Sequence, residues 1–341
     1  MRLSKIVPFG CTIWAALFFC AYAQAQVGKG DQEAKQSAAK YTPTETEVER
    51  GRQLLQNYER NRKQVSRYAC AMFVDRTHED FEKPQNTSHA QDWYFHAWDS
   101  TKNIARQDEL VLRTGILAGL NGEQVSLSDQ KSTLFVTDQD VIQVSNARSN
   151  NSISTKDAKD EDFDVLRPQA LPNPWMIPFH GSLAVDLQLR IGSVRKKFYL
   201  DVKASEIEIL NFDEVGRFSG VEFAMPGESA LTWKAVFDKE SGDMPIRVER
   251  IIDQVNYSGI MGVGETEWIH VDNLWLPQKV NLESKIGPPQ KPVGLSSHRT
   301  DLYWVLGDNV PEDVFVTTPP DVMRPAELKQ AILEFAVGRK K

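Results

Sequence analysis

The sequence predicts an α+β fold, in which one N-terminal helix precedes a long, curved antiparallel sheet of about ten or eleven strands. The apolar residues follow a helical period from Glu45 to about Ser66 and a period of two through most of the later chain. Short turn sequences separate many of the period-two segments. They favour antiparallel neighbours, because parallel strands need long crossover connections.

The composition is that of a globular protein with a sizeable core. The chain has 341 residues, of which 41% are hydrophobic and 26% charged. Its net charge of −7 argues against general nucleic-acid binding, which needs a basic surface. Collagen, coiled-coil and polytopic membrane architectures are excluded as well.

Residues 1–25 have the pattern of a secretory signal peptide. Arg2 and Lys5 precede a mostly apolar run at 6–19, and small residues allow cleavage after Ala25. An uncleaved anchor helix is the alternative, although the run is shorter than a membrane span usually requires. The protein is therefore expected to be exported to the periplasm or secreted, with no transmembrane span after signal removal.

The helix follows a flexible polar linker at 26–44. Thr44 can cap the helix, and Glu45 and Glu47 suit the positive end of its dipole. A single domain is expected at 45–325, before a basic C-terminal tail at 326–341 that can form a short helix. The predicted strands in this domain are, in order, 70–77, 93–98, 105–112, 133–137, 141–145, 198–203, 206–212, 218–224, 231–238, 246–255, 265–271, 279–284 and 301–306.

Two segments interrupt the strands. Residues 145–164 are rich in Ser and Asn and then acidic at 157–164, which predicts a surface loop; a calcium site is the alternative, but an EF-hand spacing is missing. Residues 171–179 contain three prolines among apolar residues. This segment is either a loop packed on the core or a lid over an open sheet, and a short helix can follow at 182–191. The lid residues would be Trp175, Met176 and Phe179.

The sequence predicts no catalytic residue, no metal site and no cofactor. Nucleophile-elbow, phosphate-loop and zinc-protease motifs are missing, and the six histidines are scattered. The glycine-rich run at 259–264 leads into a strand and is interpreted as a hairpin loop, not as a dinucleotide fingerprint. Cys70 lies in an apolar stretch and is expected to be a small buried side chain.

The strands carry more apolar surface than one sheet face requires. The sequence has eight tryptophans, and most lie on or beside proposed strands. Such an excess favours a concave face that encloses an apolar ligand, as the mouths of β-barrels do; packing by the helix and loops is the alternative. The candidate cavity residues, chosen by alternation along each strand, are Trp93, Phe95, Phe198, Leu200, Phe223, Trp233 and Phe237.

Several loose motifs follow one another in a fixed order over roughly residues 45–322. These motifs are 54–58 running into 67–71, Lys102-Asn103-Ile104-Ala105-Arg106-Gln107, 275–280 with 300–304, and Val310-Pro311-Glu312-Asp313-Val314-Phe315 before Pro319 and Pro320. Their order resembles the LolA/LppX-like superfamily of periplasmic lipoprotein and lipid carriers. The resemblance implies an unclosed half-barrel whose apolar concave face takes up acyl chains. Arg106 would either contact a polar head group or lie on the outer face.

The leading expectation is therefore a non-enzymatic exported carrier or binding protein for a lipid, an acyl chain or a lipoprotein. An RseB-like envelope sensor, which would bind a protein partner and no lipid, is the alternative. A secreted hydrolase is a third hypothesis, but it would need converging His and carboxylate groups that the sequence does not display.

Overall fold

Strands with alternating apolar residues pair side by side along most of the chain. The computed structural model describes residues 41–102, 104–114, 116–118, 124–126, 130–136, 140–145, 148–154, 174–175, 178, 190–191, 194–195, 204–224, 231–254, 257–315, 330 and 334. The helix and the strands are α2 (Glu45–Lys63), β1 (Arg67–Asp80), β2 (Ser88–Asp99), β3 (Ile104–Thr114), β4 (Ile116–Ala118), β5 (Gln124–Ser126), β6 (Gln130–Val136), β7 (Asp140–Ser145), β8 (Arg148–Ser154), β9 (Arg190–Ile191), β10 (Val194–Arg195), β11 (Glu208–Val215), β12 (Phe218–Ala224), β13 (Leu231–Asp238), β14 (Met244–Gln254), β15 (Tyr257–Val271), β16 (Leu274–Ile286) and β17 (Gly294–Leu306).

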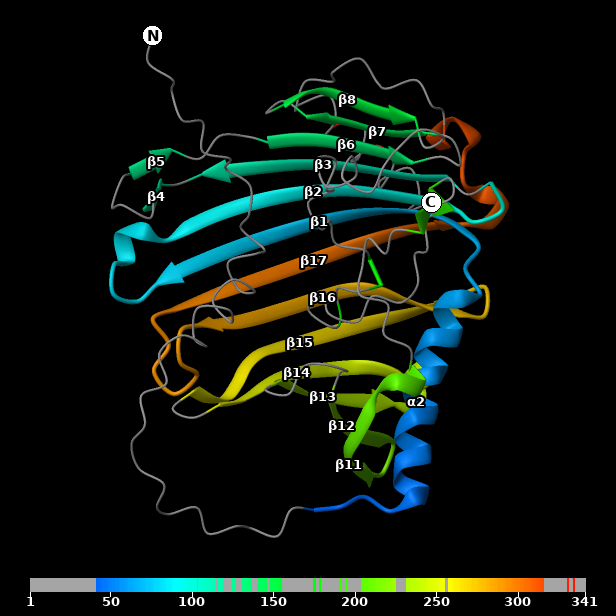
Figure 1. Cartoon of the computed structure of the whole chain (residues 1–341), viewed down its shortest axis with the longest axis vertical. Helices are drawn as coiled ribbons and strands as arrows, with labels where there is room; N and C mark the ends of the chain where they lie inside the picture. Colours follow the sequence, from blue (N-terminus) through cyan, green and yellow to red (C-terminus); the bar gives the residue numbers. More distant parts are fainter. Residues whose placement is uncertain are drawn as a thin grey trace.

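One unclosed antiparallel sheet dominates the fold (Figure 1). Within the described residues it contains thirteen strands in the order β11-β12-β13-β14-β15-β16-β17-β1-β2-β3-β6-β7-β8. Two meanders meet where the last strand, β17, pairs antiparallel with the first, β1. The outermost strands, β11 and β8, do not pair with each other, so the sheet stays open. The predicted α+β class is thereby confirmed.

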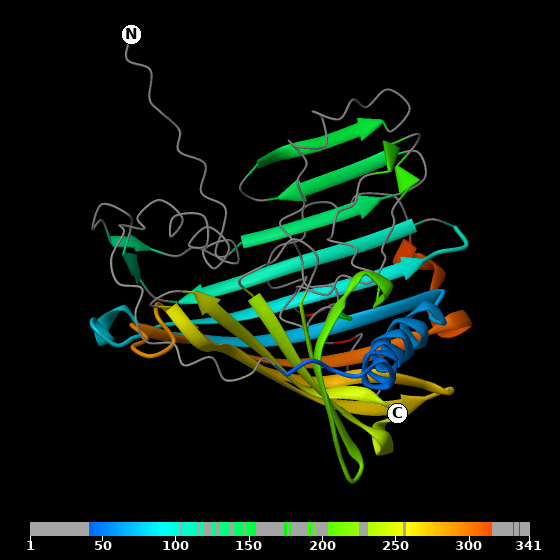
Figure 2. The same cartoon turned by 60° about the horizontal axis from the view of Figure 1, so that its bottom comes forward.

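The sheet is strongly twisted. Figure 2 shows the yellow-green strands of the β11 end running steeply across the cyan and green strands of the other end. A right-handed twist of each strand accumulates across many neighbours and gives such a shape. Register shifts in β13–β14, β14–β15 and β15–β16 add local bends, because the bulged strand carries one extra residue.

The register assigns every strand side chain to one of two faces. The face that packs against α2 is the helix face, and its residues on the central strands include Cys70, Met72, Tyr94, Leu302 and Trp304. The opposite face is the C-terminal face, because the segment after β17 covers it. There Val310 and Phe315 pack on Ala69, Ala71, Phe95, Ala97 and Val305.

Thr44 caps helix α2, as its sequence predicts, and forms a capping box with Glu47. The Thr44 hydroxyl accepts a hydrogen bond from the Glu47 backbone N–H at 3.3 Å, and the Glu47 carboxylate accepts one from the Thr44 N–H at 2.8 Å. Leu54, Leu55 and Tyr58 form the buried side of the helix. Among the described residues no helix has the length and apolar character needed to cross a bilayer.

Two sequence interpretations are wrong. Residues 148–154, assigned to a polar loop, form edge strand β8, where the backbone pairs with β7 and polar side chains are tolerated. The glycine-rich run at 259–264, assigned to a hairpin loop, lies inside β15. Gly259 has a positive φ of 128° and lies beside a register shift. Its conformational freedom is therefore used at an irregularity within a strand and not in a hairpin turn.

Several predictions concern residues outside the described part of the chain. These are the signal peptide at 1–25, most of the linker, the acidic segment at 157–164, residues 182–189 of the predicted helix at 182–191, the strand at 198–203 and the tail except for two of its residues. The last two residues of that predicted helix, Arg190 and Ile191, form strand β9 instead.

Candidate functional site

The register places the predicted cavity residues on different faces of the sheet. Trp93 and Phe95 lie on the C-terminal face, in phase with Phe73 and Ala71 of β1. Phe223, Trp233 and Phe237 lie on the helix face beneath α2. Alternation along a strand distinguishes two faces but does not match faces between strands, so the set does not form one cavity. Phe198 and Leu200 are outside the described residues.

The helix face beneath α2 is filled. Phe223, Trp233 and Phe237 are at most 1% exposed and pack with Leu55 and Tyr58 of the helix. Close packing of this kind leaves no volume for a ligand. A ligand could enter only if α2 separated from the sheet, which would expose these apolar side chains. These three side chains are therefore core residues in this state of the protein.

Beyond α2, the helix face presents apolar side chains that are only half-buried. Trp304 and Leu306 of β17, Leu282 of β16 and Ile269 of β15 border the buried residues of the central strands. They pack against the cluster of buried residues that contains Met72, which is fully buried. This region, which we term the apolar strip, offers a half-buried apolar surface to a ligand.

The predicted lid residue Trp175 lies against the apolar strip. Its ring centroid is 5.0 Å from that of Trp304, and its backbone carbonyl accepts a hydrogen bond from the Tyr58 hydroxyl of α2. Trp175 is 1% exposed. Trp175 thus contacts both the helix and β17. Met176 and Phe179 are outside the described residues.

Polar side chains follow the apolar strip on the same face, toward the ends of β1 and β2 that form their hairpin. Asp92 is 2% exposed, and its carboxylate pairs with the Arg76 guanidinium at 2.5 Å and accepts the Tyr94 hydroxyl at 3.2 Å. The His298 Nε2 lies 3.1 Å from the Ser296 hydroxyl. The sequence patterns did not predict this cluster. Its signal is that the positions in phase with Leu302 on β17 become polar, at Thr300, His298 and Ser296, while on β1 Arg76 follows the apolar Val74.

Two histidines of the helix face are held neutral. Burial and then the charge of Arg62 lower the pKa of His96 to about 3. Burial and then the charge of Arg76 lower the pKa of His298 to about 4. Neither imidazole can act as a proton carrier near pH 7, because both are already deprotonated there.

Arg106 lies on the C-terminal face. Its Nε donates to the Asp108 carboxylate at 2.8 Å, and its Nη1 donates to the Val314 carbonyl at 3.2 Å. Its guanidinium also lies over the Phe95 ring, 5.9 Å from the centroid. These contacts hold the segment after β17 in place. Of the two positions considered for Arg106, these contacts favour the outer face of the sheet over contact with a ligand head group.

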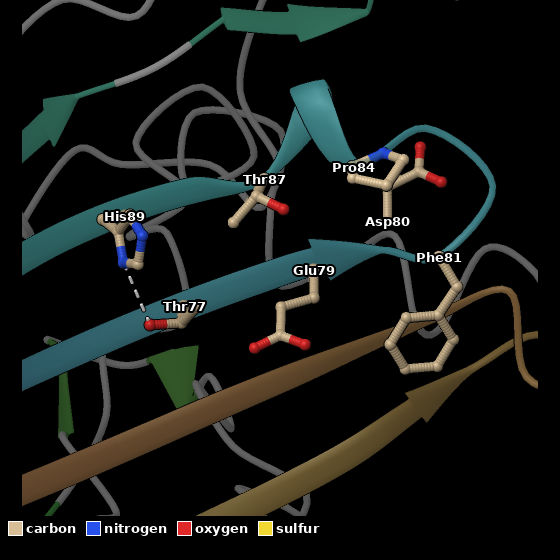
Figure 3. Close-up of a pocket in the computed structure, with 7 residues that line it drawn as sticks. All are labelled: Thr77, Glu79, Asp80, Phe81, Pro84, Thr87 and His89. Carbon is tan, nitrogen blue, oxygen red and sulfur yellow. Dashed lines mark hydrogen bonds between the residues drawn. The ribbon is translucent and has the colours of Figure 1, made fainter.

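A separate hollow of about 500 Å³ lies at the β1–β2 hairpin (Figure 3). Its lining is formed by Thr77, Glu79, Asp80, Phe81, Pro84, Thr87 and His89. The Asp80 carboxylate accepts the backbone N–H groups of Glu82 and Lys83 and therefore stabilises the hairpin turn. Phe81 and Pro84 form the apolar part of this lining, beside the polar and charged side chains of the other residues.

No catalytic chemistry is evident in the described part of the chain. No group of three or more His, Cys, Asp and Glu side chains is placed there to hold a metal ion. Cys70 is fully buried, and burial raises the pKa of its thiol well above the ordinary value. It is therefore a packing residue and not an activated nucleophile.

The chain resembles known proteins only at the level of solved structures. No family model and no curated protein matches the chain. Among solved structures, a DUF1329 family protein from Desulfovibrio piger is similar at 9% identity and a TM-score of 0.39, over 80% of this chain and 98% of that one. A putative outer membrane lipoprotein-sorting protein domain from Vibrio parahaemolyticus is similar at 9% identity and a TM-score of 0.41, over 79% of this chain and 97% of that one. Similarity at this level assigns neither a family nor a function.

Proposed function

We propose that the protein is a non-enzymatic, exported carrier or binding protein that takes up an acyl chain, from a lipid or a lipoprotein, on the helix face of its sheet. One observation supports the proposal most. The apolar strip is only half-buried, lies beside α2 and is bordered by the buried Trp175. A signal-like N-terminus supports a site of action in the cell envelope.

Burial of the chain provides the binding energy in this proposal. Removing about ten methylenes from water contributes about 8 kcal/mol before the entropic costs of association. Association costs reduce this gain, so the expected Kd is weaker than about 1 μM, with little dependence on salt. A carrier benefits from such an affinity, because it must release its ligand.

The test uses the purified full chain. We expect organic extraction followed by mass spectrometry to recover acyl species, and a fluorescent fatty acid to bind the delipidated protein with a saturable signal. As a matched control, Leu282→Glu on the helix face should abolish binding, whereas Leu295→Glu, at the far end of β17, should not. Recovery of no acyl species, together with no probe uptake, would contradict the proposal.

A second candidate function is an envelope sensor that binds a protein partner and no lipid. The filled core beneath α2 favours it, because Phe223, Trp233 and Phe237 leave no volume there. This candidate predicts a saturable protein complex whose affinity does not change when the protein is delipidated. A carrier predicts competition between the partner and the acyl chain.

A further inference from the structure

The helix face changes from apolar to polar along the central strands. Cross-strand rows near α2 contain Trp304 with Cys70, and Leu302 with Met72. The next rows, toward the β1–β2 hairpin, contain Thr300, His298 and Ser296 at the same phase of β17. Val74 and Val280 flank Thr300, and Leu282 of the apolar strip pairs with His298, so the apolar and polar side chains adjoin in these rows. One continuous surface therefore joins an apolar region to a polar one. An amphiphile likewise joins an apolar chain to a polar head group.

The polar region is a defined cluster, which we name the polar cluster: Arg76, Asp92, Tyr94, Ser296, His298 and Thr300. Asp92 and Thr300 are each 2% exposed, and Asp92 accepts from both Arg76 and Tyr94. Arg76 keeps 15% of its side chain exposed, and His298 and Ser296 are half-buried. The donors and acceptors at the border of the cluster can therefore reach a ligand, while Asp92 supports them from below.

The charges within the polar cluster cancel. The Arg76 cation is balanced by the Asp92 carboxylate at 2.5 Å. Burial lowers the pKa of His298 to about 4, so its imidazole adds no charge at neutral pH. A head group with its own net charge would remain uncompensated in this half-buried setting, which is unfavourable. Uncharged hydroxyl and ester groups would have a smaller desolvation cost, because the cluster offers them hydrogen-bond partners.

We propose that the polar cluster binds the polar end of a single-chain amphiphile without net charge, of the acylglycerol type, while its acyl chain lies along the apolar strip. This inference rests on the proposed function and assigns it a ligand class. It also assigns the head-group contact to Arg76 on the helix face, in place of Arg106 on the opposite face.

The experiment compares three probes that share one acyl chain and differ in head-group charge: monooleoylglycerol, oleate and oleylamine. Their displacement of N-phenylnaphthylamine from the full chain gives a Kd for each. For the unmodified protein we expect monooleoylglycerol to bind most tightly. Asp92→Asn leaves the cluster with a net positive charge and should move the preference toward oleate by about tenfold, which corresponds to one uncompensated interaction of about 1.4 kcal/mol.

Two further variants keep this test independent of folding defects. Arg76→Gln should move the preference toward oleylamine. The double variant Arg76→Gln with Asp92→Asn has no net charge and should return to monooleoylglycerol. The matched control is Asp108→Asn on the C-terminal face, where the carboxylate is equally buried and also pairs with an arginine. It should leave the order of the three probes unchanged.

The outcomes separate the two proposals. If the unmodified protein binds none of the probes, the proposed function fails. If it binds them but the order is the same in Asp92→Asn and Arg76→Gln, only the assignment of the head-group site is overturned. A shift caused by Asp108→Asn would also overturn it and would place the head group beside Arg106.

Discussion

Two histidines illustrate how single residues of the helix face are adapted to an apolar setting. His96 is 3% exposed and stacks on Tyr68, with 5.5 Å between ring centroids. Its pKa of about 3 and that of His298, about 4, lie far below the ordinary value of 6.5. Each imidazole is therefore neutral in the folded chain and takes up a proton on unfolding.

This difference predicts acid sensitivity. Because the folded pKa lies below the unfolded pKa, stability is fully present above about pH 6.5 and is lost as the pH falls toward the folded values. Protonation of His96 in the unfolded chain should by itself lower the free energy of unfolding by about 2 kcal/mol between neutral pH and about pH 5. Urea unfolding at both pH values measures the loss, and His96→Phe should reduce it. Equal pH dependence in the variant would contradict the assignment.

The close approach of the backbone at Gly294 leads to a second prediction for a single residue. A Cβ at this position would lie 2.4 Å from the backbone carbonyl oxygen of Glu79, which cannot move without disturbing the β1–β17 pairing. Gly294→Ala should therefore cost about 1–3 kcal/mol of stability. Gly51→Ala is the comparison, because its Cβ would meet only side chains, Ile209 and Val221, at 3.2 Å. Thermal unfolding should show a clearly larger loss for the first variant.

At the scale of elements, one asparagine fastens α2 to the sheet. The Asn61 side chain donates to the Trp275 carbonyl at 2.7 Å and accepts from the Trp275 N–H at 3.0 Å. It is 8% exposed, so both bonds are shielded from water. This pair of bonds positions the helix beside the apolar strip.

Asn61→Ala should therefore destabilise the protein by about 2 kcal/mol, since two backbone groups would lose their partner in a buried setting. Asn57→Ala serves as the control, because Asn57 reaches Asp243 only at 3.5 Å. Chemical denaturation of the two variants should separate them. Equal stability would show that apolar packing alone positions α2.

The segment after β17 is held by two arginines of the C-terminal face. Arg67 donates to the Val310 carbonyl at 3.1 Å and to Glu312 at 2.8 Å, while Arg106 donates to the Val314 carbonyl. Arg106→Ala would leave Asp108 buried without this arginine and should cost about 3 kcal/mol. Acyl-probe affinity should stay within about twofold, because the segment covers the opposite face. Parallel measurements of Tm and probe Kd check both statements.

At the scale of the whole molecule, the sequence predicts the fold class well but does not predict which strand residues share a face. A helical period followed by a period of two, with short turns, is sufficient to predict one helix and an open antiparallel sheet. The grouping of Trp93 with Trp233 was wrong, because the register between distant strands and the bulges at β13–β16 decide which residues share a face. The pair of Arg76 and Asp92 was missed for the same reason, since it forms only when β1 and β2 align.

The most direct test of the central claim is photochemical labelling of the full chain with a diazirine-bearing fatty acid, followed by peptide mapping. The account predicts labels on helix-face residues of the central strands, above all Leu282, Trp304 and Leu306, and loss of those labels when unlabelled acylglycerol competes. Labels on Trp93, Phe95 or Tyr303 of the C-terminal face, or no saturable labelling at all, would contradict it.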